Sequence, residues 1–393
     1  MRTAAIWLIL LGLLTLRLPE LFFEPRFWAE EGSIYFAHAL RVGALDALAS
    51  AHLGYYSLIP TLATTLAAHL GPLAQAPLIT TLFAFAWQVA TLAIILSSRS
   101  RLLPTQGHRA ALAIALILTS PAEVWLNTIN AQFWAATGVF IILFSDLPGR
   151  HKQAATLAYL AIACLTGVPS LFFAMYLPVR WILSRDRFWA WANAIAATGL
   201  IIQLAAFTGT ESTGDIVRFP VGQLAQIDKS MIRTMFWIGS DLFRLPLILP
   251  RGIVIAALMS AWLAFVLLHR KEPTRLLFTL FPALAYTALA TFASDSMTGG
   301  PRYGLPIAAM TFIILINLTK YLPRPAALAV FFLGVALQIP SFLNMGYVHN
   351  PAWPTWQDQI AARDPAAPWS VQATPPTINQ RFRFIIPPDS GTP

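Results

Sequence analysis

Charged residues are scarce in this chain. They make up 11% of its 393 residues, whereas 57% are hydrophobic. A soluble globular domain carries roughly 25% charged residues, so this composition excludes a soluble enzyme. Apolar runs recur from Ala4 to Leu343. The chain is therefore predicted to be an all-α polytopic membrane protein that lies almost entirely in lipid.

Cysteine is scarcer still. A single residue, Cys164, excludes an intramolecular disulfide, and its place in an apolar run indicates a packing role. The chain also lacks a Gly-rich phosphate-binding loop, a His-Glu-x-x-His motif and a Cys/His metal cluster. No cofactor is predicted, and a divalent metal held by outer carboxylates is left open.

The net charge of +9 does not come from one basic patch. Lys and Arg are scattered between apolar runs, so no nucleic-acid partner is expected and membrane orientation accounts for the charge. Short connections that are rich in Lys and Arg favour the cytoplasmic side. Five connections contain such residues, which are Arg99, Arg101 and Arg109; Arg150 and Lys152; Arg185 and Arg187; Arg270, Lys271 and Arg275; and Lys320 and Arg324.

About eleven apolar runs are candidates for transmembrane helices. The first is predicted to be a retained signal anchor, because its apolar stretch from Ala4 to Leu16 is followed by Arg17 and Pro19 instead of a small-residue cleavage site. The break at Gly167-Val168-Pro169 must be an external turn if all the basic connections share one side. The runs are 4–23, 76–96, 110–122, 131–147, 154–167, 169–184, 188–208, 246–268, 275–294, 302–320 and 325–343.

The segment 57–70 is too short to cross the membrane. As a helix it would extend about 21 Å, against roughly 30 Å of hydrocarbon. Leucines recur along it at every fourth position, with threonines on another face, which predicts an interfacial helix. A second amphipathic stretch, 34–48, has Tyr35 off its apolar stripe. The outer loop 24–75 is therefore predicted to hold two interfacial helices.

This topology places the N-terminus in the cytoplasm and most acidic residues outside. The external segments include the outer loop, a longer loop at about 209–245 and the C-terminal tail 344–393. The predicted domains are a transmembrane domain over 1–343 and a small irregular cap over 344–393, where Pro, Trp and polar residues are frequent.

Two adjacent carboxylates, Glu30 and Glu31, follow the first run among aromatic residues. Partial burial and mutual repulsion would raise the pKa of one of them and suit it to accept a proton. Neighbours on a helix point about 100° apart, so one carboxylate could face a reacting group while the other binds a metal, a donor or a supporting side chain. The alternative is a solvated helix N-terminus, where both acids complement the helix dipole.

Arg302 and Tyr303 begin a later apolar run, after a Gly-Gly-Pro sequence. A guanidinium at the outer membrane boundary fits a lipid phosphate bidentately. The pair is a candidate donor-phosphate site. The alternative is that both residues anchor the run at the membrane interface.

Three carboxamides, Asn127, Asn130 and Gln132, lie close together between Trp125 and Trp134. Amides pair with hydroxyls and indoles stack on sugar rings, so Asn127, Asn130, Gln132 and Trp125 are candidates for acceptor or sugar binding. The alternative is that the amides cap two helix ends.

The segments WAEEGSIYFAHAL, LGYYSLIP, NTINAQFWA, TGVPSLFFAMYLPVRW and PRYGLPI resemble the GT-C superfamily of integral-membrane glycosyltransferases, and more narrowly a loosely characterised group of bacterial GT-C-like membrane proteins. The resemblance covers most of residues 1–320. It implies that the first acid, Glu30, is the catalytic base and that the Arg302-Tyr303 pair lies near a lipid phosphate. The group's first motif commonly reads Trp-x-Glu-Asp-Gly, so Glu31 in place of Asp leaves the order of the two acids open.

The sequence thus predicts a GT-C-like fold and a glycosyltransferase of a bacterial inner membrane. It would transfer a sugar from a polyprenyl-phosphate donor to a cell-envelope glycan or glycolipid on the outer face. The alternatives are a transporter or lipid flippase, an accessory subunit of glycan assembly, and an O-antigen-type polymerase or ligase. Transmembrane helices almost free of charge favour the enzyme over a carrier.

Overall fold

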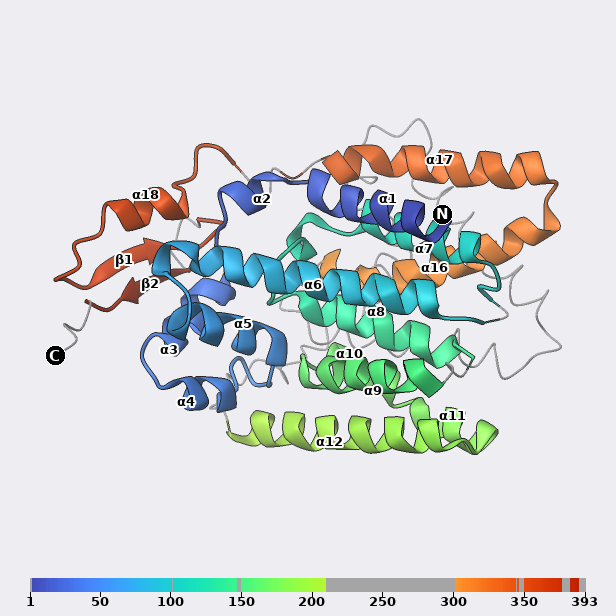
Figure 1. Cartoon of the computed structure of the whole chain (residues 1–393), viewed down its shortest axis with the longest axis horizontal. Helices are drawn as coiled ribbons and strands as arrows, with labels where there is room; N and C mark the ends of the chain where they lie inside the picture. The colour runs from blue at the N-terminus through green and yellow to red at the C-terminus, as the bar shows by residue number, and fades with distance from the viewer. Residues whose placement is uncertain are drawn as a thin grey trace, which may run out of the picture.

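The computed structural model describes residues 2–100, 102–146, 150–209, 301–343, 345, 350–376 and 382–388. Over these residues the chain forms a bundle of roughly parallel and antiparallel helices, with a small helix-and-hairpin unit at one end (Figure 1). The predicted runs 246–268 and 275–294, and all but the start of the loop at about 209–245, lie outside the described residues.

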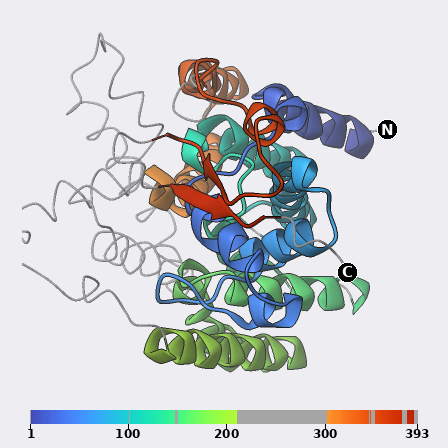
Figure 2. The same cartoon turned by 90° about the vertical axis from the view of Figure 1, so that its left-hand side faces the viewer.

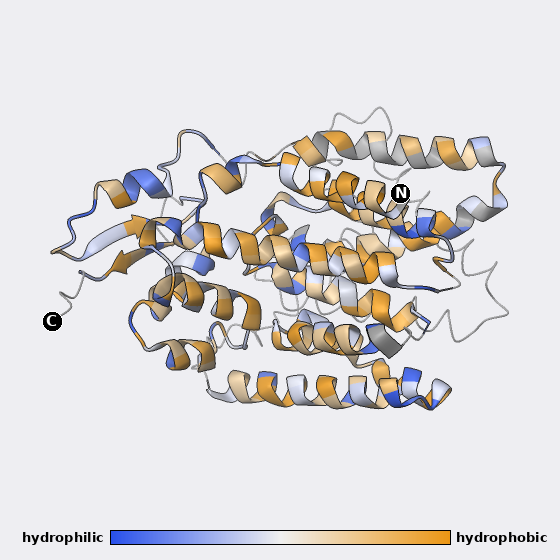
Figure 3. Cartoon of the chain, viewed as in Figure 1, coloured by the Kyte–Doolittle hydropathy of each residue, from blue (hydrophilic) through white to orange (hydrophobic). Residues whose placement is uncertain are grey.

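The long helices of the bundle follow the apolar runs of the sequence. Figure 3 shows hydrophobic residues along their lengths and hydrophilic ones mainly at their ends. Helix α8 is buried on almost every side and occupies the centre, as expected of a helix that is apolar all round. The bundle consists of α1 Arg2–Leu16, α6 Ala76–Ser97, α7 Gln106–Thr119, α8 Ala131–Phe144, α9 Arg150–Leu165, α12 Arg187–Gly209, α16 Leu305–Leu318 and α17 Arg324–Leu343.

Two predicted runs are interrupted. The first helix ends at Leu16 and a separate turn, α2 Glu20–Phe23, follows it. The run 169–184 is divided into α10 Pro169–Ala174 and α11 Leu177–Ser184, because Pro178 has no N–H to continue the first of these helices. The predicted break at Gly167 is present, and Gly167 has the left-handed φ of 84° that glycine adopts readily.

Two helical segments of the described residues are long and apolar enough to cross a membrane, Leu73–Ser97 and Arg187–Gly209. The other bundle helices searched are shorter or less apolar. The predicted total of about eleven transmembrane helices therefore stays a prediction.

The bundle has two chemically distinct ends. The N-terminus of α1 and the C-terminal ends of α6, α8, α11 and α16 lie together at one end (Figure 1). The basic connections of the described chain belong to this end. The opposite end receives the loop after α2, the turn at Gly167 and the C-terminal unit. This segregation is the one that the charge clusters predicted.

The segment 57–70 of the outer loop 24–75 forms a separate helix, and its place at the membrane interface stays a prediction. Helix α5, Leu58–His69, is a separate short helix that buries its threonine and alanine face and leaves Leu70 exposed at its end. The prediction for 34–48 was wrong. Tyr35 is buried, and the segment forms a π-helix, η1 Glu31–Phe36, then α3 Ala37–Ala39, a turn, and α4 Ala44–Ala49. Smaller turns in the described chain are η2 Leu73–Gln75, η3 Ala122–Val124, η6 Pro301–Gly304 and η7 Thr319–Tyr321.

The C-terminal tail is more regular than predicted. Helix α18, Trp356–Ala361, precedes two antiparallel strands, β1 Trp369–Gln372 and β2 Arg383–Ile386, with Trp369 opposite Ile386. The expectations of an all-α chain and an irregular cap were wrong here. The strands alternate buried and exposed side chains with a period of two, but each is so short that the Pro-rich composition around it hides the pattern.

Arg17, just after α1, links this first helix to α17, the last helix of the bundle. Its guanidinium lies 4.4 Å from the ring centre of Trp125 and 5.0 Å from that of Phe342. Its Nη1 donates to Ser120 Oγ at 2.8 Å and its Nε donates to the carbonyl of Phe342 at 3.0 Å. Arg17 is buried, so its cation packs the bundle from within.

Candidate functional site

The candidate site lies at the end of the bundle opposite the basic connections. Four segments meet there: the acidic loop 24–36, which includes η1; the turn at 52–57; the loop 121–130 between α7 and α8; and η6 before α16. The chain is non-helical or irregular in most of them, so their backbone groups need partners from one another. The resulting network places the functional side chains.

A sharp turn from Trp28 to Glu31 contains both acids. The N–H of Glu31 donates to the carbonyl of Trp28 at 2.8 Å, and the N–H of Trp28 donates to Glu31 Oε2 at 3.0 Å. Between them, Ala29 has φ of 45°, a left-handed conformation that non-glycine residues seldom adopt. This turn directs Glu30 and Glu31 to different surroundings.

Glu31 is bound inside the protein, with 1% of its surface exposed. Its Oε1 accepts hydrogen bonds from the N–H of Thr128, at 2.8 Å, and from the hydroxyl of the same residue. Burial raises the pKa of Glu31, and the hydrogen bonds from Thr128 and Trp28 oppose that shift. The carboxylate of Glu31 therefore holds the loop 121–130 and takes the supporting contact that was expected of one acid of the pair.

Glu30, in contrast to Glu31, is only partly buried. Its negative charge acts on Tyr35 and Tyr55, whose pKa values are raised first by burial and further by neighbouring groups that include Glu30. Glu30 is also within electrostatic reach of Arg302. Of the two predicted catalytic acids, Glu30 is the one whose charge acts on Arg302.

Tyr55 is a site residue that no role was predicted for. Burial raises its pKa to about 12, Gln132 and Arg302 act in the opposite direction, and Tyr303 and Glu30 add to the increase. These five residues therefore form one polar cluster. The segment LGYYSLIP marks Tyr55 as unusual, since adjacent tyrosines in a short polar turn between apolar helices need a polar surrounding.

The turn that carries Tyr55 is held from both sides. The N–H groups of His52 and Tyr55 each donate to the other's carbonyl at 3.1 Å. The next residue, Tyr56, is bound by the side-chain amide of Gln203 on α12, which accepts from its N–H at 2.9 Å and donates to its carbonyl at 2.8 Å. The N–H of Gly167 donates to the same carbonyl at 3.2 Å. Tyr55 is thus fixed by helices far from it in the sequence.

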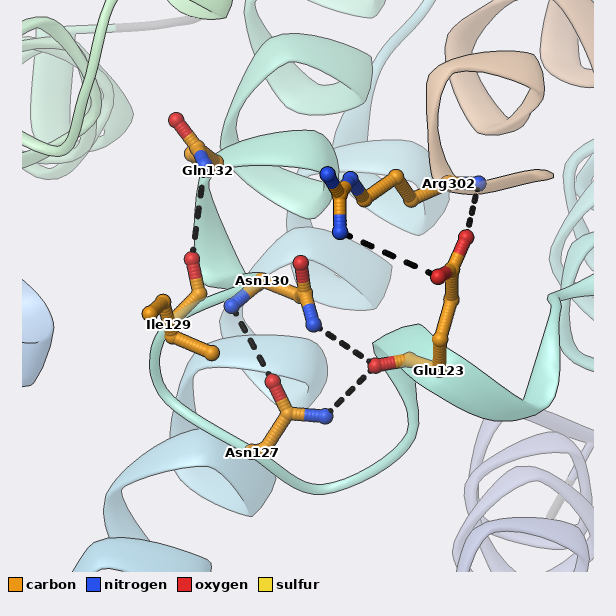
Figure 4. Close-up of polar contacts among 6 residues, drawn as sticks. All are labelled: Glu123, Asn127, Ile129, Asn130, Gln132 and Arg302. Carbon is orange, nitrogen blue, oxygen red and sulfur yellow. Dashed lines mark hydrogen bonds and ion pairs between the residues drawn. The ribbon is translucent and has the colours of Figure 1, made fainter. Parts of the chain in front are cut away.

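Arg302 is positioned by Glu123, a second residue without a predicted role (Figure 4). The backbone N–H of Arg302 donates to Glu123 Oε1 at 2.6 Å, and its Nη1 lies 3.9 Å from Glu123 Oε2. Burial raises the pKa of Glu123, and the charge of Arg302 lowers it. The Arg302 side chain remains 41% exposed, so the guanidinium can still meet an anion. A lone acid among Pro121 and apolar residues needs a cation, which was the available signal.

The amides of the loop 121–130 face inward (Figure 4). Asn127 Nδ2 and Asn130 Nδ2 both donate to the backbone carbonyl of Glu123 at 2.7 Å, and the N–H of Asn130 donates to Asn127 Oδ1 at 3.0 Å. Both side chains are buried. The side chains of Asn127 and Asn130 therefore hold the loop together, and Asn130, at the N-cap of α8, makes no side-chain cap hydrogen bond there.

Of the remaining predicted residues, Trp125 supports the loop, whereas Tyr303 and Gln132 belong to the candidate site. Trp125 is buried beneath the loop and stacks on Arg17, so its ring does not face outward as predicted. Tyr303 lies against Phe133, with 5.0 Å between the ring centres, and beside Arg302. Gln132 is partly exposed, with its Nε2 3.4 Å from the carbonyl of Ile129. Tyr303 and Gln132 thus belong to the polar cluster.

A metal-binding set is not evident in the part of the chain that the structure describes. No three His, Cys, Asp or Glu residues of that part lie close enough together to hold an ion. A divalent metal therefore remains without assigned protein ligands.

Comparisons with known proteins give little further definition. No protein family and no curated protein matches the chain. Among solved structures, the chain is similar to ArnT from Cupriavidus metallidurans in the apo state, with 15% sequence identity and a TM-score of 0.40. The match covers 84% of this chain and 62% of the ArnT chain, which is less than two thirds of its length. A likeness at this level carries no argument about activity, so the function has to be argued from the site.

Proposed function

We propose that this protein is a GT-C-type membrane glycosyltransferase. It transfers a sugar from a polyprenyl-phosphate donor to a glycan or glycolipid of the bacterial cell envelope, on the outer face of the inner membrane. The observation that carries this proposal is the anchoring of Arg302 by Glu123, which leaves the guanidinium 41% exposed and within the electrostatic influence of Glu30. A carboxylate and a partly exposed guanidinium meet the two needs of such a transfer, which are to remove a proton and to bind a phosphate.

The chemistry is a single displacement at the sugar's anomeric carbon. Glu30 accepts the proton of an acceptor hydroxyl while that oxygen bonds to the anomeric carbon. The bond from the same carbon to the phosphate oxygen breaks, and the polyprenyl phosphate leaves with the bonding electrons. Arg302 stabilises the charge that develops on the phosphate, because its planar guanidinium can donate two parallel hydrogen bonds.

The other members of the polar cluster have supporting roles in this proposal. Tyr55, Tyr303 and Gln132 surround the space between base and guanidinium and offer hydroxyl and amide groups to the sugar. Asn127 and Asn130 act indirectly by shaping the loop that carries Glu123. Trp125 supports that loop from below.

The distribution of ionisable residues supports an enzyme over a transporter or flippase. A carrier requires such residues at mid-membrane depth, commonly near broken helices. Helices α6, α8 and α16 contain no Asp, Glu, Lys, Arg or His. In this part of the described chain, the charges of the candidate site are confined to the end of the bundle.

The experiment is a transfer assay with the full chain purified in detergent and mixed with a radiolabelled polyprenyl-phosphate sugar and envelope glycolipid. We expect label in the acceptor with the wild-type chain and with Glu24→Gln, since Glu24 is an exposed carboxylate of the same loop. Glu30→Gln should transfer little. Equal transfer by both variants, or retention of all label in the donor by the wild type across the tested donors, would contradict the proposal.

A further inference from the structure

The C-terminal unit does not merely cover the end of the bundle. Its two strands face the viewer in Figure 2, and two backbone hydrogen bonds of Thr374, which follows β1, join the unit to the acidic loop. The N–H of Thr374 donates to the carbonyl of Phe27 at 2.9 Å, and the N–H of Ala29 donates to the carbonyl of Thr374 at 2.6 Å. These bonds form a parallel bridge between Trp28 and Thr374.

The parallel bridge ends at Ala29, and the backbone conformation of this residue determines where the next residue, Glu30, is placed. Ala29 has the left-handed φ of 45°, and a non-glycine residue keeps such a conformation when its surroundings hold it there. The hydrogen bond from its N–H to Thr374 is one such restraint. Its carbonyl also accepts from the N–H of Ser33, at 3.3 Å, inside the following helical turn.

Aromatic packing fixes the same contact from its other side. Phe27 and Phe36 of the acidic loop meet Trp356 and Phe384 of the C-terminal unit, and the ring centres of Phe27 and Trp356 are 5.1 Å apart. Phe384 lies 6.4 Å from Phe27 and 6.2 Å from Phe36 by the same measure. All four side chains are buried.

Gly32 shows how closely the two parts approach. A Cβ atom at this position would lie 2.8 Å from Phe27 Cβ, 3.1 Å from Ala373 Cβ and 3.1 Å from Phe384 Cε1. A side chain after the acidic pair would therefore press first on Phe27 of the same loop and then on Ala373 and Phe384 of the C-terminal unit, so the close packing of loop and hairpin requires a residue without a Cβ here. This requirement gives the glycine of the Glu-Glu-Gly sequence a structural reason.

We infer that the C-terminal hairpin is a positioning element of the acidic loop, in which Thr374 and Phe384 hold Ala29 and thereby aim Glu30. As regards catalysis, this inference rests on the proposed function. The position of the loop is a separate observable, so the two can fail separately. A hairpin that only shields apolar side chains would change the stability of the protein and leave the loop's conformation and the turnover of folded protein unchanged.

The test compares two neighbours on β2. Phe384→Ala removes the ring that contacts the loop, whereas Ile385→Ala changes a side chain on the opposite, half-exposed face of the same strand. Hydrogen exchange of the full chain in detergent should show faster exchange of peptide 27–33 in Phe384→Ala and unchanged exchange in Ile385→Ala. Transfer by folded Phe384→Ala should have kcat reduced at least tenfold with donor KM within about threefold, as expected when a group acting in the transition state is displaced.

A second pair of variants keeps the inference testable if the hairpin of Phe384→Ala does not fold. Gly32→Ala should also accelerate exchange at 27–33, whereas Gly43→Ala should not, because the nearest atom to its new Cβ is at 3.6 Å. Fast exchange of the hairpin with wild-type protection at 27–33 in both test variants would overturn the inference. If the wild type transferred no sugar, the exchange data would still decide it and the failure would fall on the proposed function.

Discussion

Thr128 donates both its backbone N–H and its hydroxyl to one carboxylate oxygen of Glu31. This contact joins the loop after the first helix to the loop between α7 and α8. The charge of the adjacent acid, Glu30, acts instead on Arg302 and Tyr55. Glu31 thus holds two loops together, and its neighbour Glu30 is the acid that we propose as the base.

Glu31→Ala should destabilise the protein. It removes the acceptor of three buried donors, the N–H of Trp28 and both groups of Thr128, and each unsatisfied donor costs about 1–3 kcal/mol. We expect a loss of roughly 3 kcal/mol or more in the free energy of unfolding, seen as a lower Tm in detergent. Glu24→Ala, at an exposed position, is the control. Equal Tm values for the two variants would show that Glu31 holds nothing.

Stability should also depend on the charge of His52. Burial, and after it the charge of His38, lowers the pKa of His52 from 6.5 to about 4. Its ring lies edge-on to Tyr35 and His38, with 4.8 Å between ring centres in each case. Because the folded state disfavours the protonated ring, its contribution to stability is complete above pH 6.5 and is lost as pH falls towards about 4.

The measurement for His52 is Tm between pH 7 and pH 4. His52→Phe keeps an aromatic ring and removes the titration, so its Tm should fall less across this range than that of the wild type. His69→Gln, at an exposed position on α5, should follow the wild-type curve. Parallel curves for wild type and His52→Phe would refute this assignment.

Arg302→Lys should weaken donor binding more than turnover. Lysine keeps the charge but loses the planar pair of donors, and the loss of one charge-assisted hydrogen bond corresponds to about a tenfold increase in donor KM. Steady-state kinetics with the polyprenyl-phosphate donor measure this change. Arg41→Lys, an exposed arginine near the same end of the bundle, should leave KM unchanged. An unchanged KM for Arg302→Lys would remove the phosphate role of Arg302.

The orientation of the chain can be tested with reporter fusions. We expect an outside signal from a fusion at Gly71, after the short helix α5, and a cytoplasmic signal from a fusion at Ser98, after α6. The reason is that the ends of α6, α8, α11 and α16 share the side that carries the basic connections. A cytoplasmic signal at Gly71 would make α5 a transmembrane helix and reverse the topology.

The helices were predictable where composition decides them. Uncharged apolar runs gave α6, α8 and α12 with boundaries close to those observed, because a buried helix needs nothing more specific than apolar length. The surface helices were harder. In 34–48 the alternation of apolar and polar residues suggested one amphipathic helix, but Tyr35 is buried by packing against other loops.

The site was predictable in its residue types and less so in its partners. The adjacency of Glu30 and Glu31 implied that one acid would take a supporting contact, and Glu31 does so with Thr128. That the partner would be Thr128, or that Glu123 would hold Arg302, depends on loops brought together by the whole bundle. No local pattern records such contacts. The packing of the hairpin against Gly32 could not be predicted for the same reason.

The division of roles between the two acids is the central claim. It is tested most directly by the kcat of Glu30→Gln and Glu31→Gln, each normalised to folded protein. A general base contributes about 10²- to 10⁴-fold, so Glu30→Gln should lose at least about a hundredfold while its Tm and donor binding stay near wild type. Glu31→Gln should lower Tm and lose less kcat. Near-normal turnover by both variants, or a greater loss of kcat in Glu31→Gln than in Glu30→Gln, would contradict this account.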